Sequence, residues 1–301
     1  MKDIIVIGGI KGMVEAAASG QMQAMQTNPA AVSATYSGTG RNIAENLGRI
    51  GADAALIAAA GNDFVGKWAK QELAELGVDT ANVELIEGQN TAMNVSVLNI
   101  IGDLDFAAEN TDIFSCVTKK QIEAALPLIN ESKVVCADGT LSGEVLEYVT
   151  EKAQVPLFFD PNTEEDAEKV RDFIGRFHTI KPNRAEASAI CGMEILNEDQ
   201  LKAAGRWFAD QGVKRTFITM SGGGVYYKEG ETEGIIRPDE VLPFVNEEGA
   251  GDAFSAAILD GTVRGMSVEE IAAYGMKASA VAMECKRAVN PEMSRERLEQ
   301  E

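Results

Sequence analysis

Several features are scarce in this 301-residue sequence, and each scarcity excludes a class of protein. Lysine and arginine total 27 against 47 aspartates and glutamates, so the net charge is −20. Such a chain repels phosphate backbones, which argues against binding to DNA or RNA. No apolar run approaches the roughly 18 residues that a membrane-spanning helix needs. The opening residues, MKDIIVIGGIKG, do not resemble a signal peptide. We therefore expect a cytoplasmic protein with no nucleic-acid or membrane partner.

Histidine, cysteine and two common nucleotide-binding motifs are also scarce or absent. The only histidine, His178, lies in an apolar, strand-like run, so we expect it to be structural. The four cysteines show no zinc-type spacing and are expected to be reduced, mostly buried thiols; they are Cys116, Cys136, Cys191 and Cys285. The sequence contains no Walker-type GxxxxGK[ST] loop and no GxGxxG turn after a strand.

What the sequence does contain is a regular alternation of short apolar runs and amphipathic stretches. The expected strands are 4–7, 55–59, 133–137, 156–159, 179–181 and 216–220. The expected helices are 42–50, 64–76, 119–129, 143–152, 199–211 and 268–285. Continuous apolar strands that alternate with helices predict an α/β domain. Its sheet would be mostly parallel and covered by helices on both faces.

The segment 91–106 interrupts this alternation. Its partial period of two and the turn near Gly102 and Asp103 predict a β-hairpin with one exposed face. Together with 31–36, this hairpin would form a small sheet that projects from the main domain. Sheets of this kind often serve as a lid or as a dimer surface. Exposed strand edges are usually covered in natural proteins. We therefore expect a homodimer formed through this sheet.

The stretch NEEGAGDAF, 246–254, is the first candidate for chemistry. Gly249 and Gly251 permit a tight turn and a close approach of a ligand to the backbone. The helix that follows begins with free N–H groups and the positive end of its dipole, which suits a phosphate. Asp252, at the edge of this turn, could accept a proton from an attacking hydroxyl. The alternative is an ordinary strand-to-helix turn with Asp252 as the N-cap.

Two further motifs also have a functional and a structural interpretation. Gly38 and Gly40 precede Asn42, which could hydrogen-bond a polyol ligand or simply cap a helix. In KPNRAEA, Asn183 and Glu186 are three residues apart and share a helical face. They could hold hydrated Mg²⁺ beside a phosphate. The alternative is a capping box.

Two glycine- or proline-containing turns complete the set of candidates. In ITMSGGGVYY, 218–227, a strand runs into three glycines, and this loop could pass over a nucleotide. The alternative is a plain hairpin turn. AVNPEMS, 288–294, is by itself a loop between two helices.

The order of these motifs resembles the ribokinase-like (PfkB) carbohydrate kinase family. G-x-G-R-N lies near residue 40, D-P near 160, K-P-N-x-x-E near 181 and G-A-G-D near 249. The resemblance runs from Lys2 to about Ser294 and is nearest to the pseudouridine kinase branch, on GRNIAENL, HTIKPNRAEA, MSGGGVYY and VNPEMS. It implies one domain over 1–301. The implied fold is a Rossmann-like three-layer α/β/α sandwich with a small β-sheet lid from roughly 28–38 and 90–110.

The resemblance also implies a reaction and a site. The family uses ATP and Mg²⁺ to phosphorylate a sugar hydroxymethyl group, in this branch the 5′-hydroxyl of pseudouridine or a related nucleoside. Asp252 matches the catalytic base, and Gly249, Ala250 and Gly251 match the anion hole. The implied substrate contacts are Gly38, Asn42 and Asp138. The implied nucleotide and Mg²⁺ contacts are Asn183, Glu186, Thr219, Ser221, Gly222, Gly224 and Asn290, with Glu186 reaching the metal through water. Many members bind K⁺ at positions that correspond here to Asn246, Val289 and Ser294.

Four features depart from the family pattern. The opening strand runs into GGIKG. Judged from the position of the next motif downstream, about four residues are missing there, and the family's usual Asn and Asp are missing with them. Glu15 is a candidate replacement. Ser37 replaces a glycine. Ser221 replaces another, where a side chain would block close approach or strain the backbone. Glu248 replaces a small polar residue, and at ~4 Å in a dielectric of about 20 it would repel a phosphate charge by on the order of 4 kcal/mol.

These departures leave two alternatives open beside a nucleoside kinase. One is a kinase of the same family for another sugar, such as ribose or fructose. The other is a catalytically impaired family member that acts as a binding protein, because a fold does not guarantee its chemistry.

Overall fold

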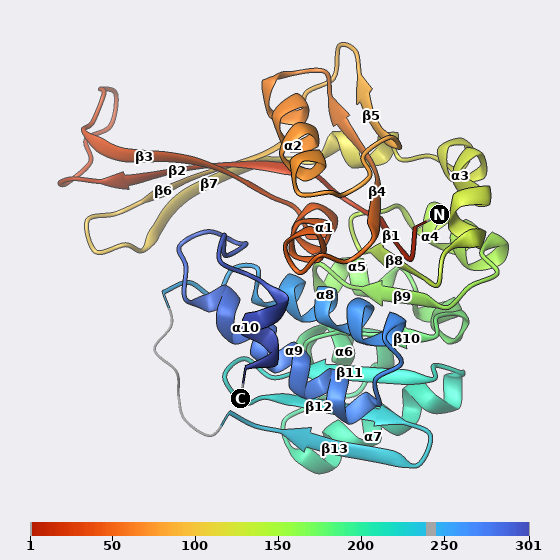
Figure 1. Ribbon diagram of the computed structural model, residues 1–301. Coiled ribbons are helices and arrows are strands. Elements are labelled where there is room, and N and C mark those ends of the chain that lie inside the picture. Colours follow the sequence, from red (N-terminus) through yellow and green to blue (C-terminus); the bar gives the residue numbers. More distant parts are fainter. Residues whose placement is uncertain (1, 239–244, 301) are drawn as a thin grey trace.

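The computed structural model describes residues 2–238 and 245–300 and is built around a nine-stranded sheet (Figure 1). Most neighbouring strands are parallel, and the two strands at one edge are antiparallel to their neighbours. In spatial order the strands are β13 (Thr232–Ile236), β12 (Val225–Glu229), β11 (Arg215–Thr219), β10 (Thr179–Ile180), β9 (Leu157–Asp160), β8 (Val134–Asp138), β1 (Ile4–Ile7), β4 (Ala54–Gly61) and β5 (Val83–Ile86).

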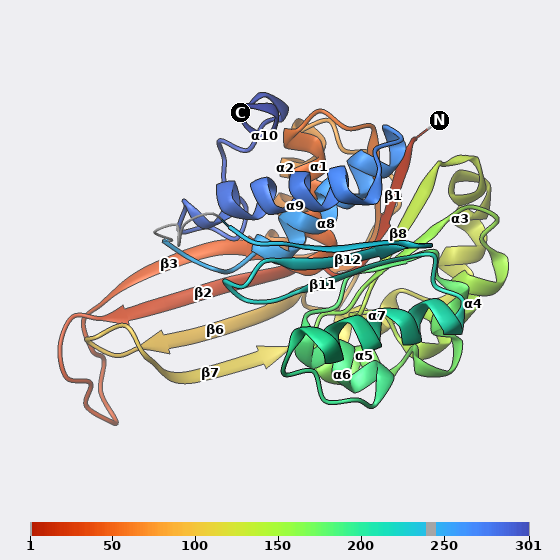
Figure 2. The same cartoon turned by 90° about the horizontal axis from the view of Figure 1, so that it is seen from below.

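Helices cover both faces of this sheet (Figure 2). One layer contains α1 (Thr39–Arg49), α2 (Phe64–Glu75), α8 (Ala250–Val263), α9 (Val268–Met283) and α10 (Arg295–Glu299). The other contains α3 (Lys119–Glu131), α4 (Gly143–Lys152), α5 (Glu164–Glu168), α6 (Arg184–Cys191) and α7 (Glu198–Gln211). Two 3₁₀ helices, Asp112–Cys116 and Arg171–Arg176, lie in connections. Across the two described ranges, none of the helices combines the length and apolarity needed to span a bilayer.

Strand β1 shows why two helical layers are needed. Ile4 and Val6 belong to the hydrophobic core shared with α1 and α8, whereas Ile5 and Ile7 belong to the core shared with α3 and α4. Successive side chains of a strand point to opposite faces of the sheet. All four residues are buried, so β1 must be covered on both sides. The predicted three-layer α/β/α sandwich with a mostly parallel sheet is confirmed.

A second sheet of four strands projects from the domain (Figure 1). In spatial order its strands are β3 (Ala30–Ser37), β2 (Lys11–Ala18), β6 (Ala92–Leu98) and β7 (Leu104–Asn110). The predicted hairpin is confirmed, because β6 and β7 pair in antiparallel register. We call these four strands the projecting sheet.

Strand β2 was not predicted by the sequence analysis, whereas the first strand ends at Ile7 as expected; the inferred shortening of the segment that follows stays a prediction. The chain passes from β1 through 8–10 directly into β2, an inner strand that pairs with both β3 and β6. The sequence of β2, KGMVEAAA, is rich in alanine and has little β-branched character, so its strand propensity is weak. Long-range pairing with two neighbours determines its conformation instead.

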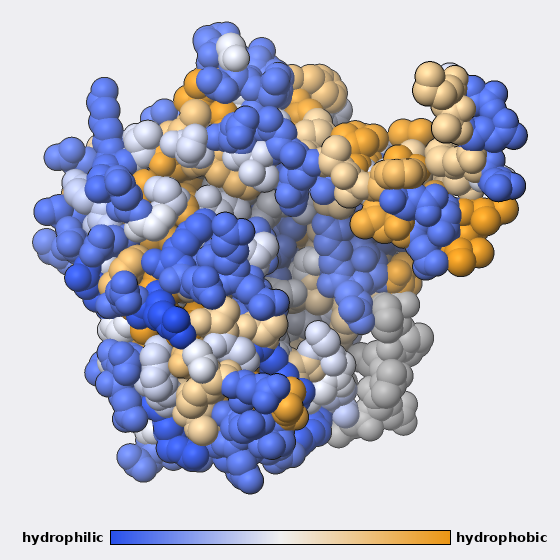
Figure 3. Space-filling view, turned by 180° about the vertical axis from the view of Figure 1, so that it is seen from behind, coloured by the Kyte–Doolittle hydropathy of each residue, from blue (hydrophilic) through white to orange (hydrophobic). Residues whose placement is uncertain are grey.

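Apolar side chains are exposed on the projecting sheet and gather there in the space-filling view (Figure 3). Every residue of β7 is exposed. The large exposed apolar side chains in this region are Val32, Val95, Ile100, Ile101, Leu104 and Phe106. A contiguous exposed apolar surface of this kind usually marks an interaction site.

Candidate active site

Two predicted site residues, Asp138 and Thr219, lie at the carboxyl ends of strands of the main sheet, as does Asp160 of the D-P motif. Asp138 ends β8, Asp160 ends β9 and Thr219 ends β11. Ligands of open parallel sheets bind in the crevice outside the carboxyl ends of the strands. The folding pattern therefore brings together motifs that are far apart in the chain.

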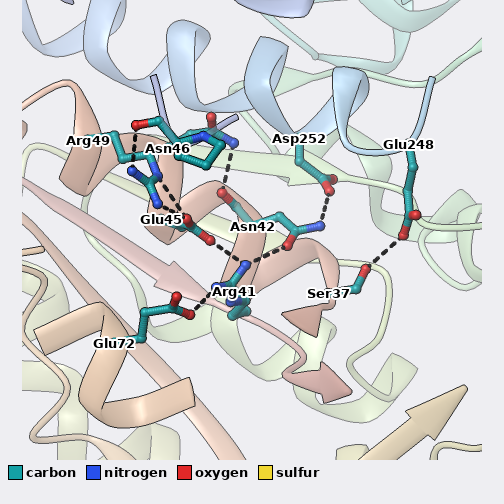
Figure 4. Close-up of polar contacts among 10 residues, drawn as sticks. Ser37, Arg41, Asn42, Glu45, Asn46, Arg49, Glu72, Glu248 and Asp252 are labelled. Atoms are coloured by element: carbon teal, nitrogen blue, oxygen red, sulfur yellow. Dashed lines mark hydrogen bonds and ion pairs between the residues drawn. The ribbon is translucent and has the colours of Figure 1, made fainter. Parts of the chain in front are cut away.

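Asp252 and Asn42 form the centre of the site (Figure 4). The amide Nδ2 of Asn42 donates a hydrogen bond to Oδ2 of Asp252 at 2.7 Å. Asn42 is buried in α1, and Asp252 is half-buried in the first turn of α8. The N-caps of these helices are Gly38 and Gly249, and neither helix has a side-chain cap. The alternative interpretations of Asp252 and Asn42 as capping residues are therefore wrong.

The turn before Asp252 requires glycine. Gly249 has φ of 78°, in the left-handed region, and a Cβ there would lie 1.8 Å from the carbonyl oxygen of Ala288. The turn therefore packs directly against the loop after α9. Ala250 and Gly251 then begin the 14-residue helix α8, whose first N–H groups have no partner within the helix.

The environment of Asp252 changes its ionisation. Burial and the charge of Asp160 raise the pKa of Asp252, and the Asn42 hydrogen bond and Lys181 lower it, so that the pKa lies at about 7. A carboxylate that titrates near neutrality is well matched to accept a proton from a hydroxyl group.

The sequence analysis missed a buried ion pair beside this turn. The ammonium Nζ of Lys181 lies 3.0 Å from Oδ1 of Asp160, and Ser255 Oγ donates to Oδ2 of Asp160 at 2.5 Å. All three residues are buried. The sequence analysis used the D-P and K-P-N motifs only for their order along the chain. A charged residue at the end of an apolar strand could itself have indicated a buried ion pair.

Asn183 and Glu186 form the predicted capping box at the start of α6. The Glu186 N–H donates to Asn183 Oδ1 at 2.9 Å, and the Asn183 N–H donates to Glu186 Oε2 at 2.8 Å. Burial raises the pKa of Glu186, and although Lys181 opposes this, the pKa lies at about 7. The cap uses Oε2, which leaves Oε1 for another partner. Capping and ligand binding are therefore compatible.

Asn183 also lies beside the glycine loop. It forms a parallel bridge with Thr219, whose N–H donates to the carbonyl of Pro182 at 3.0 Å. Within 2–238 and 245–300, no group of three or more His, Cys, Asp and Glu residues is placed to hold a metal ion. A role for Glu186 beside a hydrated Mg²⁺ stays a prediction.

The glycine loop after β11 is a hairpin turn, as the structural alternative predicted, because β11 and β12 pair in antiparallel register. Gly222 and Gly224 adopt left-handed φ values of 69° and 93°. Ser221 is exposed. Among the non-glycine residues that the structure describes, only Met25 has positive φ. The backbone strain expected at Ser221 is therefore not found.

The residues predicted to bind K⁺ lie on the loops around the turn. Asn246 Nδ2 donates to the carbonyl of Lys286 at 3.2 Å and so joins these loops. Val289 is buried, so it can offer only backbone groups. Ser294 Oγ caps α10 by accepting the N–H of Arg297 at 3.3 Å. Potassium binding at these positions stays a prediction.

Asn290 is used by local structure. Its Nδ2 donates to the carbonyl of Val281 at 2.7 Å, and its Oδ1 accepts the N–H of Glu292 at 2.9 Å. Asn290 is buried. The Asn290 amide thus has local partners, and its contact with a nucleotide stays a prediction.

Two departures from the family pattern contact each other (Figure 4). Ser37 Oγ donates to Oε1 of Glu248 at 3.2 Å. Ser37 ends β3 at the base of the projecting sheet, and Glu248 lies just before the turn. The Glu248 carboxylate is therefore drawn toward the base of the projecting sheet and is not free above the turn.

Asp138 orders the loop between β1 and β2. Its carboxylate accepts the N–H of Gly9 at 3.0 Å and the N–H of Thr140 at 2.9 Å. A Cβ at Gly8 would lie 2.0 Å from Asp138 Oδ2, and one at Gly40 would lie 3.0 Å from it. Burial raises the pKa of Asp138 to about 6. Because Asp138 is fully buried, we assign it to the loop; contact with a substrate stays a prediction.

The remaining sequence expectations concern His178 and the thiols. His178 Nδ1 contacts Oγ1 of Thr179 at 2.8 Å, and burial lowers the pKa of its imidazole. The four cysteines are free thiols, two buried and two half-buried. Both observations agree with structural roles.

Comparisons with known proteins give one consistent result. The model of the pfkB family of carbohydrate kinases matches residues 1–295. Pseudouridine kinase of Escherichia coli K12 is 31% identical over 97% of this chain and 94% of its own length. Guanosine-inosine kinase of Exiguobacterium acetylicum is 27% identical over 97% of this chain and 98% of its own. The structure of Arabidopsis thaliana ribokinase complexed with ribose and ATP superposes with a TM-score of 0.88 at 19% identity, covering 100% of this chain and 99% of that one.

Proposed function

This chain belongs to the pfkB family of carbohydrate kinases, and from that premise we propose that it transfers the γ-phosphate of ATP to the 5′-hydroxyl of pseudouridine or a related nucleoside. The relative named pseudouridine kinase supports this acceptor. The single observation that carries the proposal is the placement of Asp252. It lies in the first turn of α8 beside the glycine turn, and Asn42 holds it at 2.7 Å.

The proposed step is an in-line displacement. The acceptor oxygen forms a bond to the γ-phosphorus, the bond between that phosphorus and the ADP oxygen breaks, and ADP leaves. The hydroxyl proton passes to Asp252, whose pKa near 7 matches the task. Asn42 occupies Oδ2 and so orients the carboxylate.

The turn supplies the anion hole in this proposal. The first N–H groups of α8 and the positive end of its dipole face the transferred phosphoryl group and stabilise its charge. Gly249, Ala250 and Gly251 admit this approach because Gly249 turns the chain with a left-handed φ. Phosphoryl transfer depends mainly on such positioning and charge stabilisation.

We assign nucleotide binding to two adjacent motifs, KPNRAEA and the glycine loop after β11. Glu186, with Asn183, would hold Mg²⁺ through water, and the ion when bound would neutralise phosphate charge. Thr219 and the loop of Ser221, Gly222 and Gly224 would lie along the nucleotide, since Asn183 pairs with Thr219. Potassium beside Asn246, Val289 and Ser294 would be bound by backbone carbonyl oxygens.

Charge at the acceptor side supports an uncharged acceptor. Asp252, Asp138 and Glu248 all lie around the start of α1. Arg41, in the same helix, is paired with Glu45 and Glu72. An acceptor with its own phosphate or carboxylate would be repelled. A nucleoside satisfies this condition, and so do ribose and fructose, which form the second candidate class.

The binding-protein alternative is less well supported. Asp252 and Asn42 are in contact, the Glu248 carboxylate is held by Ser37, and Ser221 carries no backbone strain. Three of the four departures therefore leave the contact between Asn42 and Asp252 intact, whereas the Asn and Asp that the opening strand lacks have no assigned replacement.

The homodimer is proposed on the exposed apolar side chains of the projecting sheet. Leu104 and Phe106 on β7 are 60% and 72% exposed. Pairing of two projecting sheets would bury these side chains and cover the strand edges.

The test is ADP release by the purified protein with ATP, Mg²⁺ and K⁺. The acceptors are pseudouridine, uridine, ribose and fructose, and an Asp252→Asn variant is the control. We expect turnover on pseudouridine that the variant loses. Faster turnover on ribose or fructose would favour the second class. A folded protein that turns over none of these acceptors would support the binding-protein alternative.

A further inference from the structure

We propose that Lys181 is a positioning residue of the kinase site, whose buried ammonium group lies against the glycine turn and, through Asp160 and Ser255, holds in place the helix turn that carries Asp252. This inference rests on the proposed function and adds a residue to it. Lys181 does not touch the expected position of the reacting atoms; it acts through Asp252 and the backbone of the turn.

The position of the ammonium group is the first support. Lys181 follows β10 and its residue is 5% exposed. A Cβ added at Gly251 would lie 3.5 Å from Lys181 Nζ. A lysine is rarely buried to this degree unless it is paired. The charge is therefore fixed against the first turn of α8, where the N–H groups of the proposed anion hole begin.

The partners of the ammonium group fix this geometry further. Asp160 Oδ1 lies 3.0 Å from Nζ, and Asp160 Oδ2 accepts Ser255 Oγ at 2.5 Å. Ser255, in the next turn of α8, also lies 3.1 Å from the carbonyl oxygen of Gly251. The ion pair is thus attached to the same helix turn that carries Asp252.

The charges around Asp252 show what the ammonium group does. Asp252 faces carboxylates from β8 and β9, namely Asp138 and Asp160, and it faces Lys181 after β10. The buried thiol of Cys136 lies in the same environment. The carboxylates disfavour an ionised Asp252, whereas Lys181 favours it.

The ammonium group of Lys181 lies among acidic side chains, with Asp160 Oδ1 3.0 Å from Nζ. A fixed positive charge therefore serves two purposes at neutral pH. It favours the basic form of Asp252, and it adds to the positive helix end that would receive a phosphoryl group.

The first test follows the ionisation of Asp252 without using activity. Carboxyl ¹³C NMR titration, with the Asp252 signal assigned through Asp252→Asn, compares the wild-type protein with Lys181→Met and Lys181→Arg. We expect the Asp252 midpoint to rise by about one pH unit in Lys181→Met and to stay within a few tenths of a unit in Lys181→Arg. An unchanged midpoint in folded Lys181→Met would overturn the inference.

A second variant covers the case in which Lys181→Met does not fold, because Asp160 would then be buried without its partner. Lys181→Gln removes the positive charge but keeps an amide that can donate to Asp160. Binding of inorganic tripolyphosphate, measured by calorimetry with the wild-type protein as reference, is expected to weaken about tenfold, since the positive charge nearest the turn is lost. Equal affinity in folded Lys181→Gln would contradict the inference.

Kinetics then separate this inference from the proposed function. Where the wild-type protein turns over an acceptor, the acidic limb of its kcat/KM profile should move upward in Lys181→Met together with the NMR midpoint. A wild-type protein without turnover would refute the kinase proposal, while the NMR and tripolyphosphate results would still decide the role of Lys181.

Discussion

Asn42 and Asp252, 210 positions apart in the sequence, are joined by a 2.7 Å hydrogen bond from the Asn42 amide to the Asp252 carboxylate. This bond connects the first turns of α1 and α8. It lowers the pKa of Asp252, against burial and the charge of Asp160, which raise it to about 7. The bond therefore links the shape of the site to the ionisation of its proposed base.

Removal of the Asn42 amide should shift the pH dependence of the reaction. In Asn42→Ala the pKa of Asp252 rises, so less of the basic form is present at neutral pH. We expect the acidic limb of kcat/KM to move up by roughly one pH unit and kcat/KM at pH 6 to fall about tenfold. Asn46→Ala, which removes an amide of the same helix that bonds only the Asn42 carbonyl, should leave the limb in place. Equal shifts in both variants would contradict the assignment.

The raised pKa of Asp252 should also appear in protein stability. A pKa of about 7 in the folded state exceeds the ordinary value of about 3.9. The stability that protonated Asp252 contributes is fully present below pH ~4 and is lost as the pH rises through about 7. Asp252→Asn should therefore raise Tm by a few degrees at pH 8 and by little at pH 4. Exposed Asp105→Asn is the control. A gain that does not depend on pH would argue against a raised pKa.

Gly249 should be intolerant of a side chain for two separable reasons. Its φ is 78°, and a Cβ would lie 1.8 Å from the Ala288 carbonyl oxygen. Gly265 has φ of 72° with nothing within 4 Å of such a Cβ. In urea unfolding we expect Gly265→Ala to cost about 1 kcal/mol from backbone strain alone, and Gly249→Ala roughly 2 kcal/mol more from the clash. Similar losses would show that the loop after α9 yields to the added methyl group.

Glu248 should select against charged acceptors. Glu248→Gln keeps a partner for Ser37 Oγ and removes the negative charge beside the acceptor. We expect kcat/KM for orotidine, which carries a carboxylate on its base, to rise about fivefold relative to uridine, corresponding to roughly 1 kcal/mol. Exposed Glu247→Gln should leave the ratio unchanged. A fivefold change with Glu247→Gln as well would indicate a general effect of net charge instead.

The proposed dimer predicts a change in association state. Phe106→Glu places a charge on the exposed face of the projecting sheet, and sedimentation velocity at micromolar concentration should show a monomer. Phe64, which is 70% exposed on α2, provides the matched Phe64→Glu control and should leave the dimer intact. A wild-type protein that sediments as a monomer would refute the proposal directly.

Elements with a strong periodic pattern could be predicted from the sequence, and those that depend on distant pairing could not. Ile4–Ile7 is a short, fully buried apolar run, which is a clear strand signal. Lys11–Ala18 has no such signal, because its conformation comes from pairing with β3 and β6. The hairpin from β6 to β7 was predictable because its turn and its two strands are adjacent in the chain.

The site was predictable as a set of motifs but not as a set of contacts. The spacing of Asn183 and Glu186 predicted both a capping box and a ligand site, and the structure shows that the first leaves room for the second. The partner of Lys181 could not be identified, because Asp160 ends β9 and Lys181 follows β10, and local sequence does not determine the order of these strands in the sheet.

The Ser37–Glu248 hydrogen bond bears on how this chain diverged. Ser37 is buried, and its hydroxyl donates to Glu248, which lies 211 positions away. Reversion of Glu248 alone to a short side chain would strand a buried hydroxyl without its acceptor, at about 1–3 kcal/mol. Reversion of Ser37 alone would release a carboxylate beside the site. The two positions are therefore energetically coupled, and a change at one is expected to alter the cost of a change at the other.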